Sequence, residues 1–185
     1  MAVFLRTSRL LLRKWRDDDI DCFAELSAEP AVMQYLVPFP DRAAMDAWVA
    51  AARRHWVDHR FGQWVVELPG EASMIGVVGL SNLRFALPFA PSVEAAWRLA
   101  RYYWGQGYAF EAARAAIDDG FARLGLEEIV AFTVPANRAS RRVMEKLGMT
   151  HDPAEDFHFE HPRLPPGHPL RRHVLYRLRR PAPSP

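Results

Sequence analysis

Two glycines, Gly105 and Gly107, stand between a strand-like stretch and a helix-like stretch of this sequence. A chain that leaves a strand through a glycine turn and then opens a helix exposes main-chain N–H groups at the positive end of the helix dipole. Such donors bind anions, most often phosphate, and glycine lets a diphosphate approach the backbone closely. The turn by itself is equally compatible with a tight connection that binds no ligand.

Two common phosphate-binding patterns fit this turn poorly. A Walker A loop requires Gly-Lys-Ser/Thr after its first glycine, and the turn has no such sequence. A dinucleotide fingerprint requires a third small residue, but Phe110 occupies that position. The acidic pair Glu127 and Glu128 also precedes the next strand instead of ending it, so a nucleotide-dependent oxidoreductase is a distant alternative.

The segments beside the turn have clear periodicities. Residues 93–99 alternate between an apolar face and a face that carries Glu94 and Arg98, which predicts a half-buried strand. Residues 107–124 then follow a helical period, with an apolar stripe through Phe110, Ala113, Ile117, Phe121 and Leu124. We expect Glu111 and the other polar residues of this helix to face away from the core.

A second motif, PANRASRRVMEKLGM, occupies residues 135–149. Asn137 is a good helix N-cap, and Gly148 is placed to close the helix. Ser140 shares a helix face with Met144 and Leu147, so its hydroxyl should point toward the interior. The structural alternative is that this hydroxyl bonds back to a carbonyl of its own helix.

Composition indicates a globular protein, because half of the 185 residues are hydrophobic and the chain is long enough for a sizeable core. We expect one domain over residues 1–180 and a disordered tail over residues 181–185. The formal net charge of +2 is too small to indicate a nucleic-acid partner.

Cysteine and histidine usage bears on the redox compartment and on whether a metal site is present. Cys22 is the single cysteine, which excludes an internal disulfide, fits a reducing compartment and predicts a structural thiol within a helical pattern. No signal peptide or membrane-length apolar run is evident, so we expect a soluble, cytoplasmic protein with no membrane partner. Four histidines between His158 and His173 match no zinc-ligand spacing, and we therefore predict no metal site.

The remaining periodicity predicts a sheet flanked by helices. Strand patterns occupy residues 9–15, 63–68, 73–80, 93–99, 128–134 and 173–179. Helical patterns occupy residues 19–26, 30–36, 42–60, 107–124 and 137–147. A meander of antiparallel strands should lead into the strand at 93–99, after a proline-containing loop over residues 84–92.

The segment YYWGQGYAFEA resembles the acetyl-coenzyme A loop of the GNAT superfamily of N-acetyltransferases, whose pattern is Gln/Arg-x-x-Gly-x-Gly/Ala. Gly105 and Gly107 fill the glycine positions, while Tyr102 or Arg101 stands where Gln or Arg is usual. The Asn-x-x-Ser and Glu-Lys-Leu-Gly sequences of the second motif resemble the Rim-type branch, which includes ribosomal-protein N-terminal acetyltransferases. With RLLLRKW and SVEAAW, these motifs follow the order of that branch from about residue 9 to residue 148.

This resemblance implies an α/β (α+β) GNAT fold and a function. The fold has a mixed, mostly antiparallel sheet of about six to seven strands, with a V-shaped splay between the fourth (93–99) and fifth (128–134) strands. The function implied is transfer of an acetyl group from acetyl-CoA to a primary amine, with Glu94 as candidate base and Ser140 as candidate acid. A pairing of Glu94 with Arg98 on the same strand face is the structural alternative. The implied acetyl-CoA contacts are Leu99, Tyr102, Trp104, Gly105, Gln106, Gly107, Tyr108, Ala109, Asn137 and Ser140.

The acceptor stays open between a protein N-terminus, a polyamine, an amino acid and an aminoglycoside. We expect Tyr35, Trp48 and Trp56 to line its pocket, and the loop from His158 to His168 to form part of the wall. An acidic wall for a polycation has five candidates: Asp41, Asp46, Asp58, Asp156 and Glu160.

Two further questions stay open from the sequence. A non-catalytic module that binds coenzyme A as a sensor is the alternative function. Aromatic residues exposed on the helix at 42–60 would permit a homodimer.

Overall fold

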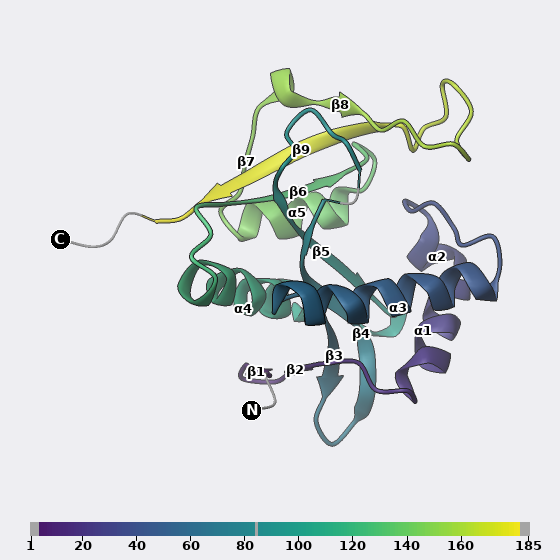
Figure 1. Cartoon of the computed structure of the whole chain (residues 1–185), viewed down its shortest axis with the longest axis vertical. Coiled ribbons are helices and arrows are strands. Elements are labelled where there is room, and N and C mark those ends of the chain that lie inside the picture. The colour runs from purple at the N-terminus through teal and green to yellow at the C-terminus, as the bar shows by residue number, and fades with distance from the viewer. Residues whose placement is uncertain (1–3, 84, 182–185) are drawn as a thin grey trace.

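The computed structural model of the protein describes residues 4–83 and 85–181 (Figure 1). Most of the predicted tail, residues 182–185, lies outside the described residues. Over the ranges that are described, no helix is both long enough and apolar enough to cross a membrane.

The helices follow the predicted patterns closely. The α-helices are α1 (Asp19–Ala28), α2 (Pro30–Met33), α3 (Arg42–His59), α4 (Tyr108–Arg123) and α5 (Arg138–Lys146), and short 3-10 turns occupy η1 (Arg101–Tyr103) and η2 (Pro153–Glu155). Residues 85–92 form the predicted loop before the central strand, and Arg84 lies outside the described residues.

The strands form a mixed, mostly antiparallel sheet. They are β1 (Leu5–Arg6), β2 (Leu11–Arg13), β3 (Gln63–Leu68), β4 (Ala72–Asn82), β5 (Val93–Leu99), β6 (Glu128–Thr133), β7 (Thr150–His151), β8 (Phe157–His158) and β9 (Arg172–Arg179). Their order is β1-β2-β3-β4-β5-β6-β9-β7, and β8 also pairs with β9. The predicted count of six to seven strands was low because β1, β7 and β8 have two residues each, too few to show a periodicity.

The sheet opens between β5 and β6, which confirms the predicted splay. These two strands are parallel and share a single register pair, Glu94 with Val130. In contrast, β4 pairs with β5 along the whole length of β5. In Figure 1, β3 to β5 run up the view, whereas β9 crosses above them, so the sheet divides into two differently directed parts.

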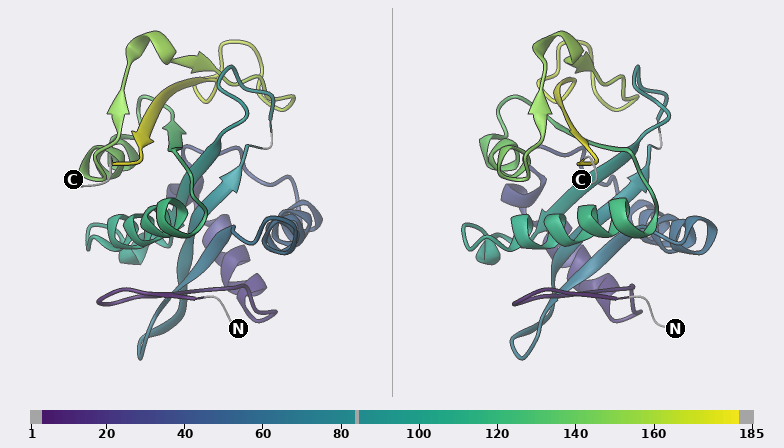
Figure 2. Two further views of the ribbon diagram at one scale, coloured as in Figure 1. Left: turned by 60° about the vertical axis from the view of Figure 1, so that its left-hand side comes forward. Right: turned by 90° about the vertical axis from the view of Figure 1, so that its left-hand side faces the viewer.

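Helices cover both faces of the sheet. Figure 2 shows α4 and α5 on one side and α3 on the other. The buried stripe of α4 runs through Ala112, Ala113, Ala116, Ile117 and Gly120, not through the predicted Phe110 and Phe121, which are only partly buried. Small residues are buried because α4 lies very close to β4: a Cβ on Gly120 would stand 2.6 Å from Cδ1 of Leu80.

Helix α3 packs its tryptophans inward. Trp56 is buried and Trp48 is half-buried, while the most exposed large apolar residue of the helix is Val57. The expectation of exposed aromatic side chains on this helix is therefore wrong, and it no longer supports a homodimer.

A buried ion pair joins the N-terminal segment to the sheet. The guanidinium of Arg13 on β2 donates to both carboxylate oxygens of Asp19 at 2.7 and 2.8 Å, and its Nε donates to Glu67 of β3 at 2.7 Å. The hydrogen bond to Asp19 raises the pKa of Arg13, although burial opposes the charge. This contact sets the position of α1 against β2 and β3.

Candidate active site

The glycine turn between β5 and α4 has the backbone of an anion site. Gly105 and Gly107 have φ values of 76° and 85°, and Gly107 is the N-cap of α4. A Cβ at Gly105 would point into open space, so the backbone is accessible there. Within the described chain, no acceptor takes a hydrogen bond from the N–H groups of residues 105–110. These donors, with the helix dipole behind them, fit a diphosphate.

Side chains of the turn fix its shape. The indole of Trp104 donates to the carbonyl oxygen of Leu99 at 2.7 Å, and the amide of Gln106 donates to the carbonyl oxygen of Tyr102 at 3.2 Å. Tyr102 is 79% exposed and Trp104 is 44% exposed, so both can contact a ligand. Tyr108 is 8% exposed, which leaves mainly its main-chain N–H for that purpose.

Arg9 also reaches this turn, and the sequence did not indicate it. Its Nη1 donates to the carbonyl oxygen of Gln106 at 3.0 Å, and its guanidinium lies 4.4 Å from the ring centre of Tyr108. Glu111 holds Arg9 in place, because it accepts from Nε at 2.7 Å and from the main-chain N–H at 3.0 Å. Glu111 is not among the buried core residues of α4, but it contacts the N-terminal segment, which the prediction that it faces away from the core did not include.

The Glu111 carboxylate holds the N-terminal segment against α4 through hydrogen bonds and an ion pair. Burial opposes its charge, but hydrogen bonds from Thr7, Arg9 and Ser8 prevail and lower its pKa. The net effect places one positive guanidinium beside the exposed N–H groups of the turn. In the sequence, Arg9 stands out only as the first residue of the strand predicted at residues 9–15.

The second motif forms the start of α5 as predicted. The side-chain oxygen of Asn137 accepts from the main-chain N–H of Ser140 at 3.2 Å, and its Nδ2 donates to Oγ1 of Thr133 at 3.0 Å. The Ser140 hydroxyl makes no hydrogen bond within the described part of the chain, so the alternative of a bond to its own helix is not observed. Ser140 is half-buried.

We call the divergence of β5 and β6 the fork. A cavity of about 250 Å³ lies on the face of the fork opposite α4 and α5. Glu94, Ala96 and Arg98 contribute its β5 wall, Phe132 contributes from β6, and His173 contributes from β9. Alternation along the strands places Ala95 and Leu99 on the α4 side instead, within the main core. The structure thus brings Glu94 to this cavity but leaves Ser140, Asn137 and the glycine turn on the opposite face.

His173 is a cavity residue whose sequence context suggested only a metal ligand. Burial lowers its pKa from the usual range, and its Nδ1 lies 3.2 Å from the carbonyl oxygen of Arg171. The imidazole is therefore neutral near pH 7, with Nδ1–H bound and Nε2 left as a base. Among the described residues, no group of three or more His, Cys, Asp or Glu side chains could hold a metal ion.

Some of the residues predicted for the acceptor wall line this cavity, and others do not. Tyr35 and Trp48 line the cavity, but Trp56 packs against Trp64 with ring centres 4.2 Å apart and lies elsewhere. From the histidine-rich region, Phe159 lines the cavity, whereas His161 only approaches the Phe85 ring, at 6.3 Å.

The candidates for an acidic wall do not surround this cavity. None of these five described carboxylates lines the cavity. Asp41 caps α3, Asp46 pairs with Arg42, Asp156 contacts His151, and Glu160 pairs with Arg171.

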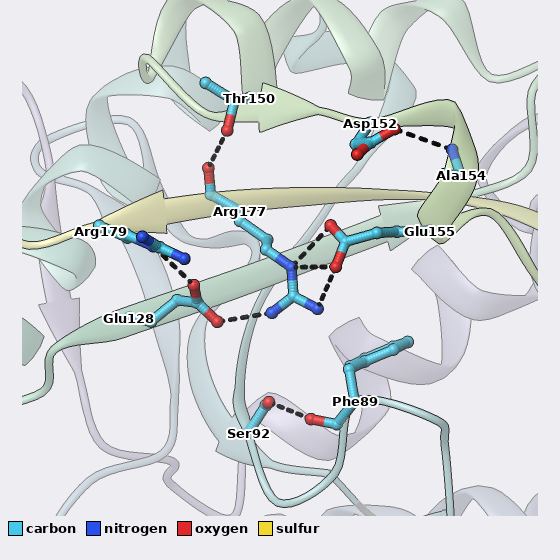
Figure 3. Close-up of polar contacts among 9 residues, drawn as sticks. All are labelled: Phe89, Ser92, Glu128, Thr150, Asp152, Ala154, Glu155, Arg177 and Arg179. Atoms are coloured by element: carbon cyan, nitrogen blue, oxygen red, sulfur yellow. Dashed lines mark hydrogen bonds and ion pairs between the residues drawn. The ribbon is translucent and has the colours of Figure 1, made fainter.

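A network of ion pairs joins β9 to β6 and η2 (Figure 3). Arg177 of β9 contacts Glu128 of β6 at 2.6 Å and Glu155 of η2 at 2.8 Å, and Arg179 also reaches Glu128, at 3.4 Å. The Arg177 guanidinium lies 5.9 Å from the ring centre of Phe89. These contacts fix β9 against β6, and with it the position of His173.

Comparisons with known proteins agree with this architecture. Residues 9–150 match the family model described as an acetyltransferase (GNAT) domain. Over 146 residues the chain is 33% identical to the uncharacterized protein YkkB of Bacillus subtilis (strain 168), which covers 78% of this chain and 84% of that protein. Over 168 residues it is 30% identical to the FsC-acetyl coenzyme A-N(2)-transacetylase of Aspergillus fumigatus, covering 88% of this chain and 71% of that enzyme.

Solved structures show the same fold. An acetyltransferase from Agrobacterium tumefaciens str. C58 superposes with a TM-score of 0.77 at 28% identity, covering 97% of this chain and 96% of that one. A ribosomal-protein-S5-alanine acetyltransferase from Vibrio fischeri superposes with a TM-score of 0.73 at 21% identity, covering 96% of each chain. At that identity the likeness to a Rim-type enzyme shows the fold alone.

The family match, together with the same fold in solved acetyltransferases, places the chain in the acyltransferase class of protein. The chain belongs to the GNAT family and is an acetyl-CoA-dependent N-acetyltransferase.

Proposed function

We propose that this enzyme binds acetyl-CoA along the α4 and α5 face of the fork and receives a primary amine through the 250 Å³ cavity on the opposite face. The observation that carries the proposal is the single register pair between β5 and β6, Glu94 with Val130. Beyond this pair the two strands do not pair with each other. A cofactor bound on one face can therefore contact an acceptor bound on the other face.

The glycine turn and α5 would hold acetyl-CoA. The N–H groups from Gly105 to Ala109 and the Arg9 guanidinium suit the diphosphate, with Tyr102, Trp104 and Gln106 at its edge. The end of β5 near Leu99 and the Asn137 amide suit the pantetheine arm. The Ser140 hydroxyl, which has no partner in the described chain, suits proton donation to the departing sulfur.

Glu94 is our candidate for the base that takes the amine proton. It lines the cavity on the strand beside the opening, where an attacking amine would have to lie. His173 lines the same cavity and is neutral, so it is the second candidate. The acceptor is a protein N-terminus or a small amine.

Ligand binding is tested by thermal stability with acetyl-CoA, coenzyme A or NAD, in the wild type and in Gly107→Trp. We expect the coenzyme A compounds to raise the melting temperature, because they bind the native state, and NAD to have no effect. The tryptophan variant should lose the shift, because it would place a large side chain on a backbone with φ of 85°. Equal shifts in both proteins would place the diphosphate elsewhere.

The role of Glu94 is tested by Glu94→Gln, with thiol release measured against saturating amine. Removing a general base should lower kcat by roughly 100-fold or more, while the coenzyme A shift stays unchanged. A kcat within threefold of the wild type would transfer the role to His173 or to water, which His173→Asn would separate.

A further inference from the structure

One cation lines the cavity in unusual surroundings. The guanidinium carbon of Arg98 lies 5.3 Å from the ring centre of Phe23, 5.8 Å from that of Phe39 and 5.6 Å from that of Trp48. Aromatic faces attract a cation, but they accept few of the five N–H bonds that a guanidinium offers.

Polar partners for Arg98 are scarce. Within the described ranges, its one hydrogen bond to a side chain runs from Nη1 to Oγ of Ser27, at the long distance of 3.5 Å. No carboxylate of the described residues lies within 4.0 Å of it, although other arginines of the chain form such pairs. Among the described residues, Arg53 contributes the one fully buried side-chain nitrogen or oxygen that lacks a partner. The remaining donors of Arg98 therefore keep access to the cavity.

Arg98 stays charged in spite of this environment. Burial lowers its pKa to about 10, which still leaves the guanidinium protonated at neutral pH. The side chain is half-buried because it borders the cavity. A cation that has lost most of its water, and that has no carboxylate of the described residues within 4.0 Å, favours an anionic ligand.

The size and charge of the cavity restrict that ligand. At about 30 Å³ per water, 250 Å³ holds roughly eight waters, which is enough to enclose a molecule of amino-acid size but not a whole aminoglycoside. Glu94 is the one carboxylate among the described residues that line it. A polyamine would meet Arg98 with a like charge.

We propose that Arg98 binds a carboxylate of the acceptor, so that the acceptor is a small primary amine carrying a carboxylate, such as an amino acid. This inference rests on the proposed function and names its substrate class. In the reaction the amine nitrogen forms a bond to the thioester carbonyl carbon and the carbon–sulfur bond breaks. The amine proton passes to the base, the thiolate takes a proton, and no oxidant or reductant is needed.

The first test uses the wild type and matched amines. Acetyl transfer is measured for L-amino acids, their carboxamides and their decarboxylated amines, with spermidine and phosphoethanolamine for comparison. We expect kcat/KM for the best amino acid to exceed that of its amide and its amine by at least tenfold. Equal or better transfer to an amide, to spermidine or to phosphoethanolamine would overturn the assignment.

The second test uses Arg98→Met, which keeps the length and the aromatic contacts, with the exposed Arg54→Met as matched control. The Arg98 variant should raise KM for the amino acid by about 10- to 100-fold and bring the ratio of acid to amide close to one. KM for acetyl-CoA should not change, and the Arg54 variant should behave as the wild type. An unchanged ratio in a folded Arg98→Met protein would refute the role of Arg98.

A binding readout separates this inference from the proposed function. With coenzyme A bound, the amino acid should raise the melting temperature further, whereas its amide should not. A coenzyme A shift without discrimination between acid and amide refutes the inference alone. No coenzyme A shift and no transfer to any amine refutes the proposed function, and the inference with it.

Discussion

At the scale of single residues, the cavity combines groups that the sequence could not relate to one another. Glu94 and Arg98 share a strand face, as the alternation predicted, but His173 comes from the last strand, about 75 residues later in the printed sequence. Its ring stacks on Phe157 and lies edge-on to Phe132. This apolar packing keeps the imidazole neutral and also links its protonation to stability.

His173 should make the protein less stable in mild acid. Its folded pKa is lowered by burial, so the unfolded chain binds a proton more readily, and stability falls as pH drops through about 6.5 toward the folded pKa. In His173→Phe this contribution disappears. Melting temperatures of both proteins from pH 7.5 to 5.0 should therefore show a smaller acid loss in the variant, and parallel curves would show that His173 titrates normally.

At the scale of elements, the face proposed to bind acetyl-CoA depends on how α4 begins. Gly107 opens the helix, and Glu111 in its first turn gathers the side chains of Thr7, Ser8 and Arg9 from the N-terminal segment. One carboxylate thus joins β1, β2 and the glycine turn. The turn keeps its shape because Arg9 holds the Gln106 carbonyl from outside.

Replacing Glu111 with Gln should weaken this junction. We expect unfolding free energy to fall by about 1–3 kcal/mol at pH 7, from lost charge-assisted hydrogen bonds, and KM for acetyl-CoA to rise several-fold. The pKa of Glu111 is lowered, so its contribution is present above its usual range near 4.5 and is lost as pH falls through the folded value.

The matched control is Asp118→Asn, on the exposed face of the same helix. It should change neither quantity by a measurable amount. A stability difference between Glu111→Gln and the wild type that persists unchanged at pH 3 would show that the charge of Glu111 does not stabilise this junction.

At the scale of the whole molecule, the fork is held open by two separately braced parts. Arg13, Asp19 and Glu67 fix α1 to β2 and β3 on one side, and Arg177 fixes β9 to β6 on the other. The main chains of β5 and β6 meet at one pair only. Figures 1 and 2 show the resulting change in strand direction across the opening.

The sequence alone determined the local structure and the family. Glycines at 105 and 107, the Asn137 cap and the alternation of residues 93–99 are local features, because positive φ, helix capping and strand period depend on neighbouring residues. They predicted the helices and the longer strands, and the resemblance to the GNAT family implied the fork. Binding of acetyl-CoA at the glycine turn stays a prediction. The two-residue strands and the buried stripe of small residues on α4 were not predicted, because each depends on which segment packs against it.

The tertiary structure decided what surrounds each charge. It removed Asp41, Asp46, Asp156 and Glu160 from the cavity by giving each a partner elsewhere. It also enclosed Arg98 among aromatic rings of α1 and α3 and of the chain between α2 and α3. Desolvation and pairing depend on segments distant in the chain, so the carboxylate that we propose for the acceptor could be inferred only from the folded protein.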